Sequence, residues 1–282
     1  MVVFIVYFIL WIAIGFEFGY GFKLYLDYRH NRVKYTAIPT IEEEEEEKEE
    51  RWDIVYVLKN DIDDGNYSEL RYSLRSLVNF PHRNVWFAGG QPERLKPDYS
   101  FPIDQKGTTK WEKVCYTLKK ICENKEISEN FWLFNDDFFV MAPNKQYHAY
   151  TDGDLAFRIL TLEDRQRGRT KYSNILRQCL FFLKQNNLPT TNYALHLPML
   201  INKIKALEVL DTYPEIINFK NIYGNYIGME AYYTSDVKYS DNSRSIDKSS
   251  PYLSSMDRSF LNGAIGNYIR ESFPEKSKYE ID

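Results

Sequence analysis

The sequence predicts an α/β fold in which a mostly parallel β-sheet is flanked by helices. Apolar runs typical of buried strands alternate with amphipathic helical patterns, an order that favours parallel strands with helices on both faces. The chain has 282 residues, which is enough for one domain or at most two small ones. Its hydrophobic fraction of 44% excludes a wholly disordered protein, because enough apolar surface exists to bury a core.

The first expected strand is the β-branched run at residues 53–58. Residues 59–68 are polar and rich in aspartate, which indicates a turn region. A helix is expected at residues 69–78, because Leu70, Leu74, Leu77 and Val78 recur at helical spacing. Ser68 is its expected N-cap.

The next expected elements are a strand at residues 84–88, a helix at 111–123 and a strand at 131–134. The second half of the chain is more helical. An amphipathic helix is expected at residues 171–185, and residues 251–280 are expected to form a helix followed by a polar tail docked on the domain.

The front of the chain predicts a membrane anchor. Residues 1–22 are almost uninterruptedly apolar and approach the roughly 20 residues that a helix needs to cross a bilayer. Four basic residues follow them, which by the positive-inside rule places the folded part in the cytoplasm. Residues 23–51 are then a basic and Glu-rich tether, and residues 52–282 form the folded domain. The alternative is an N-terminal hydrophobic helix buried in the domain.

Charge and cysteine content exclude some partners. The net charge of −4 comes from the glutamate run at residues 42–50, and 31 basic residues face 30 acidic ones from Arg51 onward. No broad polycationic surface for nucleic acid is therefore expected. Cys115, Cys122 and Cys179 are odd in number and form no Cys-x-x-Cys pair, which favours buried structural thiols and a reducing compartment.

Two adjacent carboxylates, Asp136 and Asp137, follow the apolar strand at residues 131–134. Open α/β sheets bind ligands at the carboxyl ends of their strands. Oxygen ligands suit Mg²⁺ or Mn²⁺, and a metal-bound nucleotide diphosphate is a natural occupant. In an extended chain the two side chains would point to opposite faces, so that one of them is a direct ligand. The alternative is a strand-end turn in which the aspartates cap the next segment.

Two further groups are candidates. Arg71 and Arg75 are four residues apart on one helix face beside Glu69, where two guanidinium groups could clamp a diphosphate. Structural ion pairs are the equally open alternative. His196 is one of four histidines and lies in an apolar stretch, so that it is either a core residue, a metal ligand or a catalytic group.

These motifs carry a resemblance. ELRYSLRSL (69–77) and FNDDFF (134–139) resemble the Stealth proteins, sugar-phosphate transferases of capsular polysaccharides and lysosomal glycans. The order of all motifs is more similar to a related phage and bacterial glycosyltransferase group, which includes relatives of the enzyme that glucosylates hydroxymethyluracil in DNA to make base J. The segments that match this group are 53–58, 69–77, 84–90, 135–137, 196–198 and 273–280.

The resemblance implies a GT-A type (Rossmann-like) fold and a divalent metal, Mn²⁺ or Mg²⁺. It assigns Asp136, Asp137 and His196 to the metal, and Glu69, Arg71, Arg75 and Asp136 to the donor pocket. Asp137 and His196 are the implied catalytic residues.

The expected activity is metal-dependent transfer of a hexosyl unit from a nucleotide diphosphosugar, favouring a UDP-sugar, to a hydroxyl acceptor. A glycan, a lipid-linked glycan or a hydroxymethylated DNA base could be that acceptor. Two alternatives stay open: hexose-1-phosphate transfer in capsular or surface polysaccharide synthesis, and a non-catalytic carbohydrate-binding module.

Overall fold

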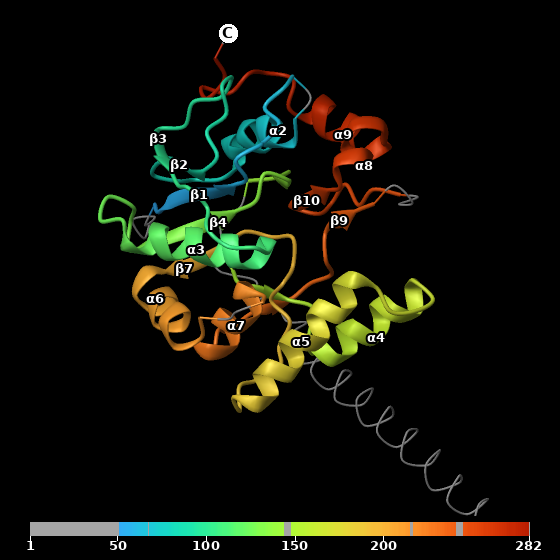
Figure 1. Cartoon of the computed structure of the whole chain (residues 1–282). Helices are drawn as coiled ribbons and strands as arrows, with labels where there is room; N and C mark the ends of the chain where they lie inside the picture. The colour runs from blue at the N-terminus through green and yellow to red at the C-terminus, as the bar shows by residue number, and fades with distance from the viewer. Residues whose placement is uncertain (1–50, 67, 144–147, 215–216, 241–244, 282) are drawn as a thin grey trace, which may run out of the picture.

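A five-stranded sheet of order β3-β2-β1-β4-β7 forms the centre of the protein (Figure 1). The computed structural model describes residues 51–66, 68–143, 148–214, 217–240 and 245–281. The strands of the central sheet are β1 (Asp53–Leu58), β2 (Val85–Gly89), β3 (Tyr99–Pro102), β4 (Asn130–Phe134) and β7 (Met199–Asn202).

The central sheet is mostly parallel, as the sequence predicts. β1 pairs in parallel with β2 on one side and with β4 on the other, and β3 continues the parallel arrangement beyond β2. Only the edge strand β7 runs antiparallel, against β4. Because β2 and β3 extend the sheet on one side of β1 and β4 on the other, the strand order reverses between β1 and β4.

Helices cover both faces of this sheet. The larger elements are α2 (Glu69–Ser76), α3 (Lys110–Glu123), α4 (Leu155–Arg165), α5 (Lys171–Gln185), α6 (Lys203–Thr212), α7 (Phe219–Tyr226), α8 (Asp257–Asn262) and α9 (Ala264–Ser272), with a 3₁₀ turn η1 (Leu77–Asn79) after α2. Alternate residues of β1 supply two cores. Ile54 and Tyr56 pack with α2, whereas Val55 packs with the helices α3 to α7. Figure 1 shows α2 and α3 on opposite sides of the sheet.

The described residues also form two smaller sheets. β5 (Phe138–Val140), β10 (Tyr252–Ser255) and β9 (Lys238–Tyr239) form a three-stranded sheet in that order, with β10 in its centre. β6 (Tyr150–Thr151) pairs with β8 (Tyr232–Tyr233). The helices α8 and α9 pack on the three-stranded sheet through a third core that includes Phe139, Leu253 and Phe260.

The predicted elements agree with the structure where the local pattern is strong. The helix at residues 171–185 has the predicted bounds, and Ser68 caps α2 by accepting a hydrogen bond from the backbone N–H of Arg71. The predicted C-terminal helix was wrong in detail. Residues 252–255 form β10 instead, and two short helices follow it. The first helix ends before Gly263, and the second packs so closely on the first that Gly266 has no room for a Cβ beside the Phe260 carbonyl.

The predicted anchor at residues 1–22 and nearly all of the tether at 23–51 lie outside the described residues. None of the helices in the described ranges combines the length and the apolar character that a membrane crossing requires. Cys115, Cys122 and Cys179 form no disulfide within the described residues, and the latter two are buried. Burial raises the pKa of each thiol to about 12, which makes these cysteines inert structural groups, as predicted.

Candidate functional site

Asp136 and Asp137 lie at the point where the strand order of the central sheet reverses. They follow β4 directly, and β4 runs parallel to β1 with Phe134 beside Tyr56, so that the loops after both strands emerge at the same edge. In open α/β sheets the crevice at this reversal is where ligands bind. The chain makes a turn at the two aspartates, so the alternation expected of an extended segment does not apply to them.

Asp137 is buried, with an exposed fraction of 8%, and is held by the three-stranded sheet. Its Oδ2 accepts hydrogen bonds from the Lys238 ammonium and, at 3.2 Å, from the Ser254 hydroxyl. The strand register explains this meeting, because Ser254 on β10 lies opposite Phe138 on one side and Lys238 on the other. Oδ1 of Asp137 is buried and has no hydrogen-bond partner among the described residues.

Asp137 lies near Glu69 and Asp136, and both of these lie near Asp257; we call these four residues the acidic cluster. Burial and the neighbouring charge of Asp137 raise the pKa of Asp136 to about 6. Burial also raises the pKa of Glu69 to about 8, with Asp137 and Asp257 adding to the effect and the Ser255 hydroxyl opposing it. Ser255 donates to Glu69 Oε1 at 2.5 Å. Because a Glu69 with this pKa is mostly protonated near pH 7, the negative charge that a further cation would neutralise lies on the aspartates, and Lys238 already offsets part of it.

His196 is held by a buried carboxylate. Its Nδ1 lies 3.0 Å from Oδ1 of Asp236, whose other oxygen accepts a hydrogen bond from Arg158 at 2.9 Å. Burial opposes ionisation of Asp236, but the hydrogen bond and charge of His196 and the charge of Arg158 lower its pKa to about 2. A carboxylate on Nδ1 fixes the imidazole and presents Nε2, the arrangement common in histidines that bind metals.

Arg71 and Arg75 contact residues outside the acidic cluster. Both bind Glu280, through Nη1 of Arg71 at 2.5 Å and Nε of Arg75 at 2.7 Å. Arg71 also donates to the carbonyls of Asp64 and Gly65 in the loop after β1. Arg75 donates instead to the carbonyls of Phe273 and Pro274 in the C-terminal tail. Of the three predicted donor-pocket residues on α2, only Glu69 thus lies in the acidic cluster.

The described residues offer a partial metal site. They contain no group of three or more His, Cys, Asp and Glu side chains that are arranged to hold an ion. Nevertheless, the unpartnered Oδ1 of Asp137 beside the Asp136 carboxyl suits a hard divalent cation. Mg²⁺ commonly takes one or two carboxylates and completes its shell with substrate phosphates, so this donor set fits the predicted ion.

The sequence analysis missed Lys238, Asp236 and Asp257. All three come from the second half of the chain: Asp236 lies in the loop between β8 and β9, Lys238 begins β9, and Asp257 begins the short helix α8. The only local signal was the alternation of Asp236 and Lys238, which places both side chains on one side of an extended segment.

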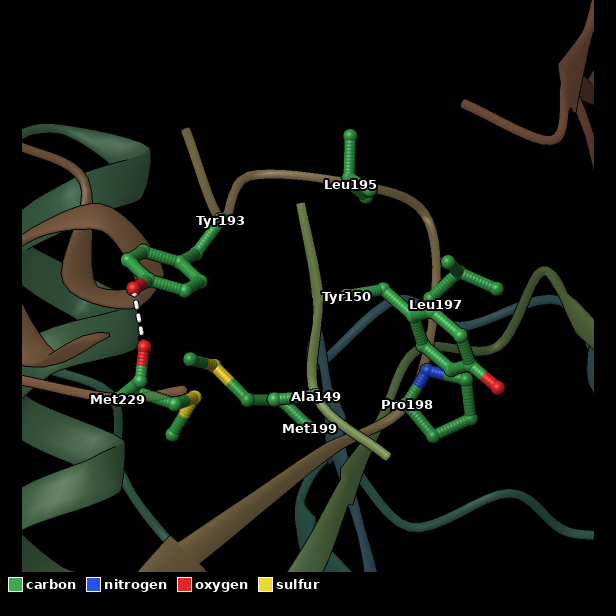
Figure 2. Close-up of a pocket in the computed structure, with 8 residues that line it drawn as sticks. All are labelled: Ala149, Tyr150, Tyr193, Leu195, Leu197, Pro198, Met199 and Met229. Atoms are coloured by element: carbon green, nitrogen blue, oxygen red, sulfur yellow. Dashed lines mark hydrogen bonds between the residues drawn. The ribbon is translucent and has the colours of Figure 1, made fainter. Parts of the chain in front are cut away.

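A small cavity lies beside the His196 segment, with a volume of about 10 Å³. It is lined by Ala149, Tyr150, Tyr193, Leu195, Leu197, Pro198, Met199 and Met229 (Figure 2). This volume is about that of one water probe, so the cavity is a packing gap and not a sugar site. Figure 2 shows that the chain curves from Tyr193 past Leu195 to Leu197 and Pro198, and that the Tyr150 ring lies beside Leu197 and Pro198.

Comparisons with known proteins give structural neighbours only. No protein-family model matches the sequence, and no curated protein matches it. The galactosyltransferase LgtC in complex with donor and acceptor sugar analogues is similar to this chain with a TM-score of 0.41 and 11% identity, over 80% of this chain and 98% of LgtC. An active-site variant of LgtC gives a TM-score of 0.40 with the same identity and coverage.

The glycosyltransferase GlyE of Streptococcus pneumoniae TIGR4 is also similar, with a TM-score of 0.33 and 9% identity over 79% of this chain and 50% of GlyE. None of these three similarities decides the fold or the function of this chain, which depend on its own topology and residues.

Proposed function

We propose that this chain is a metal-dependent glycosyltransferase that moves a hexosyl unit from a nucleotide diphosphosugar, favouring a UDP-sugar, to a hydroxyl acceptor. The observation that carries the proposal is the acidic cluster at the reversal of strand order, which contains the buried Oδ1 of Asp137 without a hydrogen-bond partner among the described residues. A site that concentrates carboxylates at this edge needs a cation, and a metal diphosphate supplies one.

The donor would lie along the edge formed by the carboxyl ends of β1 and β4. The loop at residues 59–66 follows β1 and carries Asp61, Asp63 and Asp64, whose oxygens can accept hydrogen bonds from a base or a ribose. Arg71 fixes two carbonyls of this loop, as described above. The diphosphate would then reach the acidic cluster from the β1 side.

Asp136 and Asp137 would hold Mn²⁺ or Mg²⁺, and His196 would join them once the donor and the ion are bound, since the three side chains are not arranged as a metal site without them. The ion, when bound, neutralises charge that develops on the leaving diphosphate. Asp236 orients His196 for this role, and Asp137 uses its free oxygen while Lys238 and Ser254 hold the other. The Lys238 ammonium lies beside the same carboxylate and places a second positive charge where the diphosphate would come.

We infer the class of acceptor from the predicted membrane anchor. A membrane anchor at residues 1–22 with the domain in the cytoplasm favours a lipid-linked or surface glycan over DNA. The near-neutral charge from Arg51 onward favours the same acceptors, because nucleic-acid affinity depends on basic surface.

The test is donor cleavage by the full chain. The protein is incubated with Mn²⁺ and a panel of nucleotide sugars, and the released nucleotide is separated by chromatography, with Asp137→Asn as the blank. Release of UDP from one donor is the expected result. Release of UMP would mean hexose-1-phosphate transfer. If neither nucleotide is released and no donor shifts the thermal unfolding, the alternative of a non-catalytic carbohydrate-binding module is favoured.

A further inference from the structure

Lys220, at the start of α7, reaches both halves of the proposed site. Its Nζ donates to the carbonyl oxygens of Leu195 at 3.1 Å and Leu197 at 2.7 Å, the residues on either side of His196. The same ammonium lies 4.9 Å from the ring centroid of Phe138, the residue after Asp137. One cation thus contacts the segment that carries His196 and the segment that carries Asp137.

The charges around Lys220 are those of the same two segments. Burial lowers the pKa of its ammonium to about 8, and the carboxylates of Asp137 and Asp236 oppose this shift. A desolvated ammonium is costly to bury without partners, so its two carbonyls and its aromatic ring fix where the side chain can lie. The backbone on both sides of His196 is fixed in return.

We propose that Lys220 is a positioning residue that holds the His196 segment against the Asp137 segment, so that both side chains serve one site. This inference rests on the proposed function, in which His196 and Asp137 act on the same ligand. Lys220 itself contacts backbone and ring, and acts through His196.

Lys203 provides a matched control. It also donates to two backbone carbonyls, those of Asn124 and, at 2.9 Å, Ile127, and burial lowers its pKa as well. It follows β7 at Asn202, which pairs with Asn130 at the start of β4. Lys203 therefore lies at the edge of the sheet opposite Asp136. Its substitution removes a comparable pair of hydrogen bonds to backbone carbonyls, but away from the proposed site.

The first test follows His196 by NMR in the full chain, without ligand. The chain has four histidines, and the ring signal of His196 is assigned by its loss in His196→Gln. Lys220→Met is expected to shift or broaden this signal, whereas Lys203→Met leaves it in place. The signal of His82, which contacts Tyr279 elsewhere in the fold, reports that both variants are folded. An unmoved His196 signal in folded Lys220→Met would overturn the proposal.

If Lys220→Met also loses the His82 signal, Lys220→Gln and Lys203→Gln replace the pair, since glutamine keeps a polar end but is one atom too short to bridge both carbonyls. The second test is turnover of the accepted donor. Lys220→Met is expected to lower kcat roughly 10- to 100-fold, as misplaced catalytic groups do, while Lys203→Met changes it less than about twofold. Equal losses in both would reduce Lys220 to a structural residue. Absence of turnover in the natural chain would refute the proposed function alone, and the NMR comparison would still decide the role of Lys220.

Discussion

Lys238 donates a hydrogen bond to Asp137 across 101 residues of sequence. The pair joins the turn after β4 to β9, and the Ser254 hydroxyl completes the contact from the strand between them. The side chains of Lys238 and Asp137 have exposed fractions of 24% and 11%, so the pair is largely shielded from water. The Lys238 ammonium therefore neutralises the charge of one member of the acidic cluster, Asp137.

Asp137→Asn is expected to abolish donor turnover, with a loss of at least about 100-fold, because it removes the charge that would hold the ion. Stability should fall as well, since the Lys238 ammonium loses its partner. A double-mutant cycle with Lys238→Met, measured by urea unfolding, should give a coupling energy of about 0.5–3 kcal/mol. Full turnover in Asp137→Asn would remove the metal hypothesis.

Chelation by EDTA should stop turnover, and added Mn²⁺ or Mg²⁺ should restore it. Asp236→Asn should then weaken Mn²⁺ binding roughly 10- to 100-fold, because His196 loses the carboxylate that orients it. Asp98→Asn is the control, since Asp98 contacts Val85, Lys278 and Tyr279 and so belongs to a different network. Mn²⁺ titrations followed by electron paramagnetic resonance measure the Mn²⁺ affinity of each variant. Equal affinity in the two variants would contradict the role given to Asp236.

Arg71→Lys should raise the KM for the donor, because lysine cannot hold the Asp64 and Gly65 carbonyls and Glu280 together. Arg75→Lys should leave this KM unchanged, because the hydrogen bonds of Arg75 described above go to Glu280 and to the carbonyls of Phe273 and Pro274, and not to the loop after β1. Both variants should be less stable by thermal unfolding. A KM unaffected by Arg71→Lys would return this arginine to a purely structural role.

The sequence sufficed for elements whose signal is local. The β-branched run of β1, the stripe of α5 and the serine cap of α2 depend on neighbouring residues, and all three were predicted. The same is true of Asp136 and Asp137, because an apolar strand that ends in carboxylates is visible in the sequence and its place at the sheet edge follows from parallel pairing.

Contacts between distant short strands could not be predicted. β5, β9 and β10 have three, two and four residues, too few for an alternating pattern, yet their register is what brings Lys238 and Ser254 to Asp137. Likewise, the spacing of Arg71 and Arg75 correctly placed them on one helix face, but nothing local pointed to Glu280 as their shared partner.

Glu280→Gln should lower the free energy of unfolding by roughly 2–4 kcal/mol at pH 7, because the buried Arg71 and the half-buried Arg75 both lose their counter-ion. Glu123→Gln, in an exposed pair with Lys120, should change it little. Urea titrations of the three proteins measure the difference, and equal stabilities of the natural chain and Glu280→Gln would contradict a structural role for the pair.

The stabilisation by Glu280 should depend on pH, and Glu280→Gln measures this dependence. Burial opposes ionisation of Glu280, but hydrogen bonds from Arg75, Ser277 and Arg71 lower its pKa from 4.5 to about 2. Because the folded-state pKa is the lower one, the stabilisation is complete above pH 4.5 and is lost as the pH falls toward 2. The gap between the natural chain and Glu280→Gln should shrink over that range, and a gap that widens would contradict this sign.

Removal of residues 1–50 should release a soluble domain that retains turnover, if these residues are an anchor and a tether. The measurement is the distribution of the full and shortened chains between membrane and supernatant fractions, with turnover assayed in each. An insoluble shortened chain would favour the alternative in which the N-terminal hydrophobic helix is buried in the domain.

The tail that carries Glu280 also sets an order of events during synthesis. Its backbone pairs with the segment after β2, through Lys96 to Tyr279 and Ile281 to Arg94. A ribosome makes α2 about 200 residues before this tail, since 209 residues separate Arg71 from Glu280. Throughout that interval the nascent chain carries two cations whose partner does not yet exist. The ion pairs of α2 can therefore form only after residue 280 has been made, and until then its charged face has to be stabilised by water.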